Sequence, residues 1–79
     1  MIDLIQAYLD GNTDDFYGTV GQLEGALDAS DIRDRVTIDQ WYDFWTPLEA
    51  RRAIEGNRVN KQKAIEELTR MKKFLRSKL

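Results

Sequence analysis

Apolar residues in the first part of the chain recur every three or four positions, which is the spacing of one face of an α-helix. A short first helix is expected from Ile2 until Gly11, whose freedom to adopt a left-handed backbone suits a C-terminal cap. A second helix is expected to begin behind a Thr13 cap and to run to about Ala29. The residues that should turn its apolar face to the core are Phe16, Val20, Leu23 and Leu27.

The middle of the chain carries two signals for the start of a helix. Segment 37–40 (TIDQ) has the form of a capping box, and Val36 and Trp41 on either side of its start are spaced as a hydrophobic staple. Segment 46–49 (TPLE) repeats the pattern with proline at the first helical position. Either a new helix begins at Pro47 or a single helix kinks there, and Gly56 ends it in both cases.

The last part of the chain predicts one long helix from about Asn60 to the C-terminus. Its apolar side consists of Ala64, Leu68, Met71, Leu75 and Leu79. Only segment 35–38 resembles a strand, and it would have no partner strand. The sequence therefore predicts one all-α domain over residues 1–79, a small bundle of four to five short helices with a long C-terminal helix.

The composition removes most catalytic chemistry. The 79 residues include no histidine and no cysteine, so the commonest general base, the commonest zinc ligand and the thiol nucleophile are all missing. The two serines have no histidine partner, and Asp39 and Asp43, one helical turn apart, fit a solvated helix face better than an acid-base pair. We expect no enzymatic activity, no cofactor and no metal.

One acidic loop resembles part of a calcium site. Segment 10–14 (DGNTD) matches the first, third and fifth ligand positions of an EF-hand loop. The sixth position, which needs glycine, is Asp15, and the twelfth, which needs a bidentate glutamate, is Gly21. We therefore interpret these acids as helix-capping residues.

Neither a secretory leader nor a membrane span is expected. Position 3 is an acid, no basic segment precedes an apolar one, and the apolar runs are only two or three residues long. Together with the absence of cysteine, these features predict a cytoplasmic protein that does not enter a membrane.

Charge is divided along the chain. Residues 1–45 hold ten acids and two bases, a net −8, whereas residues 46–79 hold four acids and ten bases, a net +6, which together give the total of −2. We expect the two halves to lie against each other and partly neutralise. The alternative is that one half meets a charged partner, the bases a nucleic acid or the acids a basic protein site. The bases are Arg51, Arg52, Arg58, Lys61, Lys63, Arg70, Lys72, Lys73, Arg76 and Lys78, and the acids of the array are Asp28, Asp31, Asp34, Asp39 and Asp43.

A stripe of small residues runs along the second predicted helix, opposite its apolar face. Gly18, Gly21 and Gly25, with Ala29 beyond, are separated by steps of three, four and four. Each interior glycine costs about 0.5 to 1 kcal/mol relative to alanine. The stripe predicts close approach of another helix, from a second copy, from a different partner or from the same chain, unless the helix breaks at a glycine.

Half of the eight aromatic residues lie within five positions: Trp41, Tyr42, Phe44 and Trp45. Such a cluster forms either the core of a small domain or an exposed anchor for a protein partner.

The sequence as a whole favours a small non-catalytic module for protein-protein interaction, a homodimer or other homo-oligomeric regulator, or an adaptor or inhibitor of a larger partner. The residues expected to bind are Gly18, Gly21, Gly25, Trp41, Tyr42 and Trp45. The alternative is a nucleic-acid-binding protein that uses the basic segment 46–79.

Overall fold

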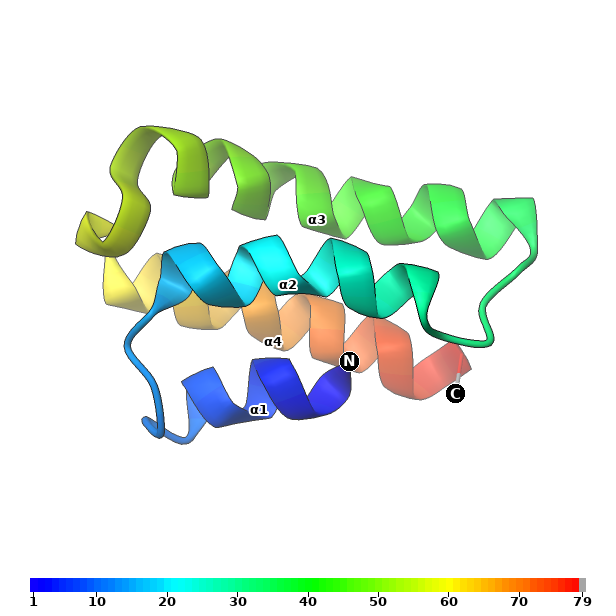
Figure 1. Ribbon diagram of the computed structural model, residues 1–79, viewed down its shortest axis with the longest axis horizontal. Coiled ribbons are helices and arrows are strands. Elements are labelled where there is room, and N and C mark those ends of the chain that lie inside the picture. Colours follow the sequence, from blue (N-terminus) through cyan, green and yellow to red (C-terminus); the bar gives the residue numbers. More distant parts are fainter. Residues whose placement is uncertain (79) are drawn as a thin grey trace.

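The computed structural model describes residues 1–78 and contains four α-helices and one turn of 3-10 helix (Figure 1). The elements are α1 (Ile2–Leu9), α2 (Phe16–Asp28), α3 (Arg35–Glu55), η1 (Gly56–Arg58) and α4 (Lys61–Lys78). Residues 1–78 contain no strand, which confirms the all-α prediction, and segment 35–38 forms the first turn of α3. The longest helix is α3 with 21 residues, whereas the C-terminal α4 has 18.

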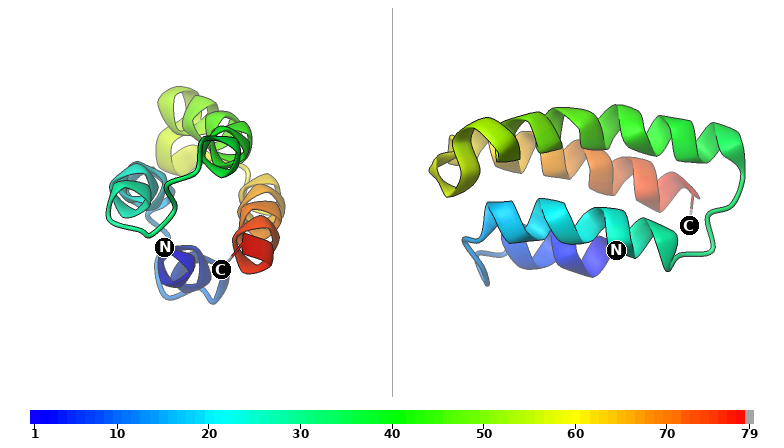
Figure 2. Two further views of the ribbon diagram at one scale, coloured as in Figure 1. Left: turned by 90° about the vertical axis from the view of Figure 1, so that its right-hand side faces the viewer. Right: turned by 45° about the horizontal axis from the view of Figure 1, so that its top comes forward.

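The helices form a ring in which each packs against two neighbours. Consecutive helices run in opposite directions (Figure 2). Around the ring, α1 lies between α2 and α4, and α3 lies between the same two helices on the other side. This is the up-down-up-down arrangement of a four-helix bundle. Because α1 has only eight residues, it covers only part of the length of its neighbours (Figure 1). The outward side of α3, like that of every helix in the ring, has no other element over it (Figure 2).

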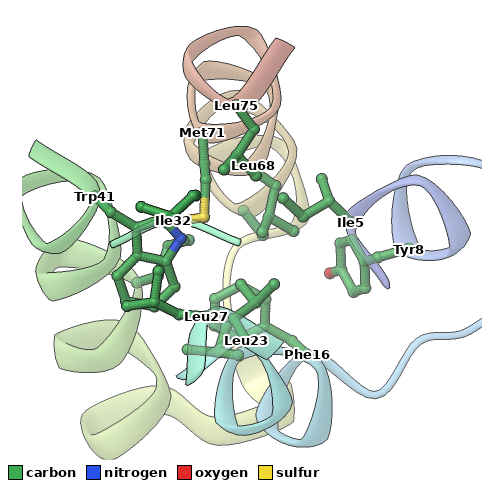
Figure 3. Packing of buried hydrophobic residues seen from close by; sticks show 13 residues of the cluster. Ile5, Tyr8, Phe16, Leu23, Leu27, Ile32, Trp41, Leu68, Met71 and Leu75 are labelled. Atoms are coloured by element: carbon green, nitrogen blue, oxygen red, sulfur yellow. The ribbon is translucent and has the colours of Figure 1, made fainter. Parts of the chain in front are cut away.

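One face of each helix fills the centre of the ring (Figure 3). The four predicted core residues of α2 are buried, and so are the four predicted residues of α4 that lie within the described part; Leu79, the fifth, lies outside it. The largest fully enclosed side chains are Trp41, Phe16, Ile5, Leu23, Leu48, Leu68, Met71, Leu75 and Val20. The helical spacing in the sequence thus places the core correctly.

The start of α2 differs from the prediction. Asp15, not Thr13, is the N-cap, because its Oδ1 accepts the N–H of Gly18 at 2.9 Å and the Nδ2–H of Asn57 at 3.1 Å. The hydroxyl of Thr13 instead accepts the N–H of Asp15 at 3.1 Å. A carboxylate is a stronger acceptor than a hydroxyl, so the cap moves two residues along the chain.

The start of α3 also differs. The N-cap is Asp34, whose Oδ2 accepts the N–H of Thr37 at 2.9 Å, so Thr37 lies inside the first turn instead of capping it. The predicted hydrophobic staple is wrong, since Val36 is 67% exposed while Trp41 is fully enclosed. Asp34 satisfies the same capping rule three residues earlier and lengthens the helix by one turn.

A single helix spans both predicted starts in the middle of the chain. Of the two alternatives at Pro47, the start of a new helix is wrong, and a single helix through Pro47 is observed. Proline has no N–H, so the carbonyl of Asp43 receives no hydrogen bond from the residue four positions on. Both residues lie on the exposed side of α3. Gly56, at φ 55°, ends α3, and Gly11, at φ 77°, follows α1, both as predicted.

The two aspartate caps should make stability depend on pH. The hydrogen bonds from Gly18 and then from Asn57 lower the pKa of Asp15, and those from Thr37 lower the pKa of Asp34. Their stabilisation is therefore complete above the unfolded pKa of about 3.9 and is lost as the pH falls through the lower folded pKa.

A variant with Asp15→Asn and Asp34→Asn keeps two capping side chains that do not titrate. We expect its urea midpoint, followed by circular dichroism, to fall less than that of the parent chain between about pH 5 and pH 2. Superimposable pH profiles would contradict the role given to the two carboxylates.

Candidate functional site

The aromatic cluster lies mostly inside the bundle. Trp41 is fully enclosed, donates its Nε1–H to the sulfur of Met1 at 3.0 Å, and stacks on Trp45 with ring centroids 5.8 Å apart. Trp45 is half-buried and donates its Nε1–H to the carbonyl of Val20 at 3.2 Å. These contacts give both indoles internal partners, which favours the core interpretation of the cluster over the anchor.

Tyr42 and Phe44 flank this pair and close two seams of the bundle. The hydroxyl of Tyr42 donates to Glu24 Oε2 on α2 at 3.2 Å, and burial, followed by the nearby Glu24, raises the pKa of Tyr42. Phe44 stacks on Phe74 of α4 at 5.0 Å between centroids. The cluster therefore joins α3 to both of its neighbours.

The three glycines of the predicted stripe have three different surroundings. A Cβ on Gly18 would lie 2.3 Å from the capping carboxylate of Asp15, so the missing side chain leaves room for the cap. A Cβ on Gly21 would lie 3.0 Å from Nη2 of Arg52, and one on Gly25 would meet nothing within 4 Å. Within the described chain, Gly21 is therefore the glycine of the stripe that a side chain of another helix approaches closely. Gly18 leaves room for the Asp15 cap, and Gly25 adjoins open space.

Arg52 crosses from α3 to α2 over Gly21. Its Nε–H donates to the carbonyl of Tyr17 at 2.9 Å, its guanidinium carbon lies 4.0 Å from the centre of the Tyr17 ring, and Nη1 contacts Glu49 at 3.1 Å. The absent side chain of Gly21 lets the planar guanidinium lie close to the α2 backbone. Close approach at this glycine is therefore made within the chain.

The bases of the alternative nucleic-acid site are split between internal contacts and the surface. Arg51 and Arg52 are held by carboxylates, Lys61 pairs with Asp14, and Lys72 donates to Gln6. Within segment 46–78, the exposed bases with no ion pair to another described residue are Arg58, Lys63, Arg70, Lys73, Arg76 and Lys78. Lys61 with Asp14 is the one ion pair within residues 1–78 that joins the acidic half to the basic half, so most of the charge polarity persists in the fold.

The acids proposed as an array, Asp28, Asp31, Asp34, Asp39 and Asp43, are all exposed. Asp34 is occupied as a cap, and Asp39 pairs with Arg35 at 3.4 Å. That pair is largely solvated, with side chains 88% and 67% exposed, so it contributes little to stability.

A further surface, absent from the sequence prediction, lies where the outer face of α3 meets α4. Two adjoining hollows share Pro47 and Glu67 in their walls. Ala50, Arg51, Ile54 and Glu55 line the first; Asp43, Phe44 and Arg70 line the second. Ile54 is 84% exposed, the largest value among the exposed large apolar residues of the described chain. We call this surface, from Val36 to Ile54 on α3 together with the hollows beside α4, the α3 outer face.

Unpaired acceptors lie beside this surface. Glu67 accepts a hydrogen bond from Arg51 Nε at 2.8 Å through Oε1, while its buried Oε2 has no partner among the described residues. Glu67 and then Glu55 raise the pKa of Arg51, which keeps this cation charged. Gln40, one turn before Phe44, likewise has a buried Oε1 without a partner in residues 1–78. Buried acceptors without donors cost free energy, which makes this seam less satisfied than the core.

The α3 outer face has a sequence signal, but the predicted helix boundaries hid it. Val36, Pro47, Ala50 and Ile54 share a side of α3 once the helix is continuous from 35 to 55. A staple at Val36 and a helix start at Pro47 would place these residues in different elements. They come onto one side only when a single helix runs from 35 to 55.

Other site chemistry has little support in the described part of the chain. No group of three or more acidic side chains in residues 1–78 is arranged to hold a metal ion. The hydroxyls of Ser30 and Ser77 donate to the carbonyls of Leu27 and Phe74. Among the described helices, none combines the length and the apolar content that crossing a membrane requires.

Comparison with known proteins gives no relative, because no family model, no curated protein and no solved structure matches the chain. The assignment of function therefore depends on the surface of this molecule.

The glycine surroundings lead to a stability test. Gly25→Ala should stabilise the chain by about 0.5 to 1 kcal/mol, because a methyl group meets only solvent and the helix gains propensity. Gly21→Ala should gain less, because the new Cβ displaces an Arg52 that Tyr17 and Glu49 hold in place. Urea denaturation of both variants measures the difference, and equal gains at the two positions would contradict the packing of Arg52 on Gly21.

Proposed function

We propose that this chain is a non-catalytic module for protein-protein interaction, and that it binds its partner through the α3 outer face. The observation that carries the proposal is a set of exposed apolar residues on the outward side of α3, where the polar Gln40 and Asp43 separate Val36 from the other three. Val36 and Ile54 are 67% and 84% exposed, and Pro47 and Ala50 lie between them. Apolar helix faces with anchors three, four and seven residues apart are a common mode of helix recognition.

The surroundings of this row also favour a protein partner. Single exposed apolar residues are ordinary, but here several align and are rimmed by both signs of charge, from Asp43 and Glu55 to Arg51 and Arg70. An apolar centre with a polar rim is the usual anatomy of a protein interface. A regulator, an adaptor or an inhibitor would each use such a surface.

Binding through Gly25 and the partly exposed Tyr42 and Trp45 is a weaker form of the same proposal, because neither of the two hollows includes these residues. Nucleic-acid binding through residues 46–79 has the exposed bases of α4 as its support. Arg51 and Arg52 add nothing to it while they pair with carboxylates. The α3 outer face offers more specific geometry than either.

A photoreactive benzoyl-phenylalanine at position 54 tests the proposed surface. In cells of the source organism we expect a covalent adduct of defined mass with a protein when the probe replaces Ile54, because this side chain is the most exposed apolar residue of the α3 outer face. The matched control places the probe at Thr69, an exposed α4 position outside the hollows. Adducts at both positions, or at neither, would contradict the proposal.

A further inference from the structure

The side chain of Met1 joins α1 to a helix on the opposite side of the bundle. Met1 is the N-cap residue of α1, but within the described chain its side chain makes no capping hydrogen bond. It packs, partly buried, against the hydrophobic core, and its sulfur accepts the Nε1–H of Trp41 at 3.0 Å. Since Trp41 belongs to α3, which lies across the ring from α1, this contact reaches from one side of the bundle to the other (Figure 2).

The position of α1 depends on a small number of inward side chains. With eight residues it is the shortest α-helix of the described chain, and a helix of this length is not stable by itself in water. Its buried residues are Ile5 and Tyr8, and Met1 packs beside them at the start of the helix. Packing of these side chains therefore holds α1 in the ring.

Trp41 depends on Met1 in turn. Its ring is fully enclosed, and among the described residues the sulfur of Met1 is the acceptor for its indole N–H. A buried N–H that loses its acceptor costs free energy. Trp45, which stacks on Trp41, has an acceptor of its own in the carbonyl of Val20. A change at the sulfur of Met1 is therefore felt first at Trp41.

The two methionines of the chain differ in their access to solvent. Met71 is fully enclosed in the core, whereas Met1 is partly exposed. A thioether is oxidised where the oxidant can reach its sulfur, and the chain has no cysteine that would compete for the oxidant. Met1 is therefore the more accessible of the two sulfurs.

We infer that Met1 is a modification site, at which a peroxide oxidises the sulfur to a sulfoxide and thereby releases α1 from the bundle. A lone pair of the sulfur attacks one peroxide oxygen, the O–O bond breaks, and the S–O bond forms. The other oxygen leaves as water or an alcohol, so the sulfur loses the two electrons that the peroxide gains. The inference goes beyond the proposed function and does not depend on the α3 outer face.

The sulfoxide does not suit the place that the thioether occupies. It is bulkier and strongly polar, and a polar group against apolar side chains is costly unless it is fully hydrogen-bonded. We expect the oxidised side chain to leave the core for solvent. Trp41 then loses its acceptor, and α1 loses one of the side chains that hold it.

The first test treats the folded chain with hydrogen peroxide and locates the added oxygen by mass spectrometry of its peptides. We expect Met1 to be oxidised about tenfold faster than Met71, or more, because Met71 reacts only when the bundle opens. In urea, where neither sulfur is protected, the two rates should be about equal. Equal rates in the folded chain would overturn the assignment of Met1 as the site.

The second test follows hydrogen exchange by NMR once Met1 is oxidised. The amides of α1 and the indole N–H of Trp41 should exchange about tenfold faster or more, and methionine sulfoxide reductase should restore the slow exchange. The indole N–H of Trp45, bonded to Val20, is the internal comparison and should change less. Unchanged exchange in α1 and at Trp41 would overturn the release of α1.

Two control chains assign the effect to the sulfur of Met1. Norleucine in place of both methionines keeps their apolar shape without a sulfur, so peroxide should leave exchange in this chain unchanged. Met71→Leu retains Met1 and should respond to peroxide as the parent chain does. A response of the norleucine chain, or no response of Met71→Leu, would overturn the inference. Circular dichroism before oxidation verifies that both chains are folded.

Discussion

The continuity of α3 through Pro47 is the constraint on which the other features depend. Proline inside a helix removes one hydrogen bond and costs about 3 kcal/mol. Trp41 and Leu48 lie on either side of it and are both fully enclosed, and burying a large apolar side chain contributes about 1.5 to 3 kcal/mol each. Because the two contacts together match or exceed the cost, and the proline lies on the exposed side, the helix stays in one piece and its outer residues form one row.

The balance between local helix signals and tertiary burial also explains which parts of the fold follow from the sequence. Helical spacing identified the core of α2 and α4 because burial dominates in those helices, and Gly11 and Gly56 ended helices because both adopt positive φ. The starts of α2 and α3 were misplaced because Asp15 and Asp34 compete with threonine hydroxyls for the same N–H groups. Local rules list the candidates, and the tertiary contact of Asp15 with Asn57 helps to decide between them.

The candidate site was less accessible to sequence reasoning than the fold. Gly18, Gly21 and Gly25 look alike in the sequence, but one adjoins a cap, one lies under Arg52 and one faces solvent. The surroundings of Gly21 depend on Arg52, which lies 31 positions further along the chain. The helical spacing within α2 carries no information about a contact with so distant a residue. The aromatic cluster lies mostly on the inner face of α3, whereas Val36 and Ile54, its exposed aliphatic residues, lie on the outer face.

The two charged pairs of α3 have different surroundings. Arg35 and Asp39 lie near the start of the helix, and their ion pair is largely solvated, so it contributes little to stability. Arg51, near the end of the helix, pairs with Glu55 and also with Glu67 of α4 at 2.8 Å, and these side chains are about two-thirds or more buried. Because a less solvated pair is screened less, the charges at the end of α3 help to hold it against α4, whereas those at its start face solvent.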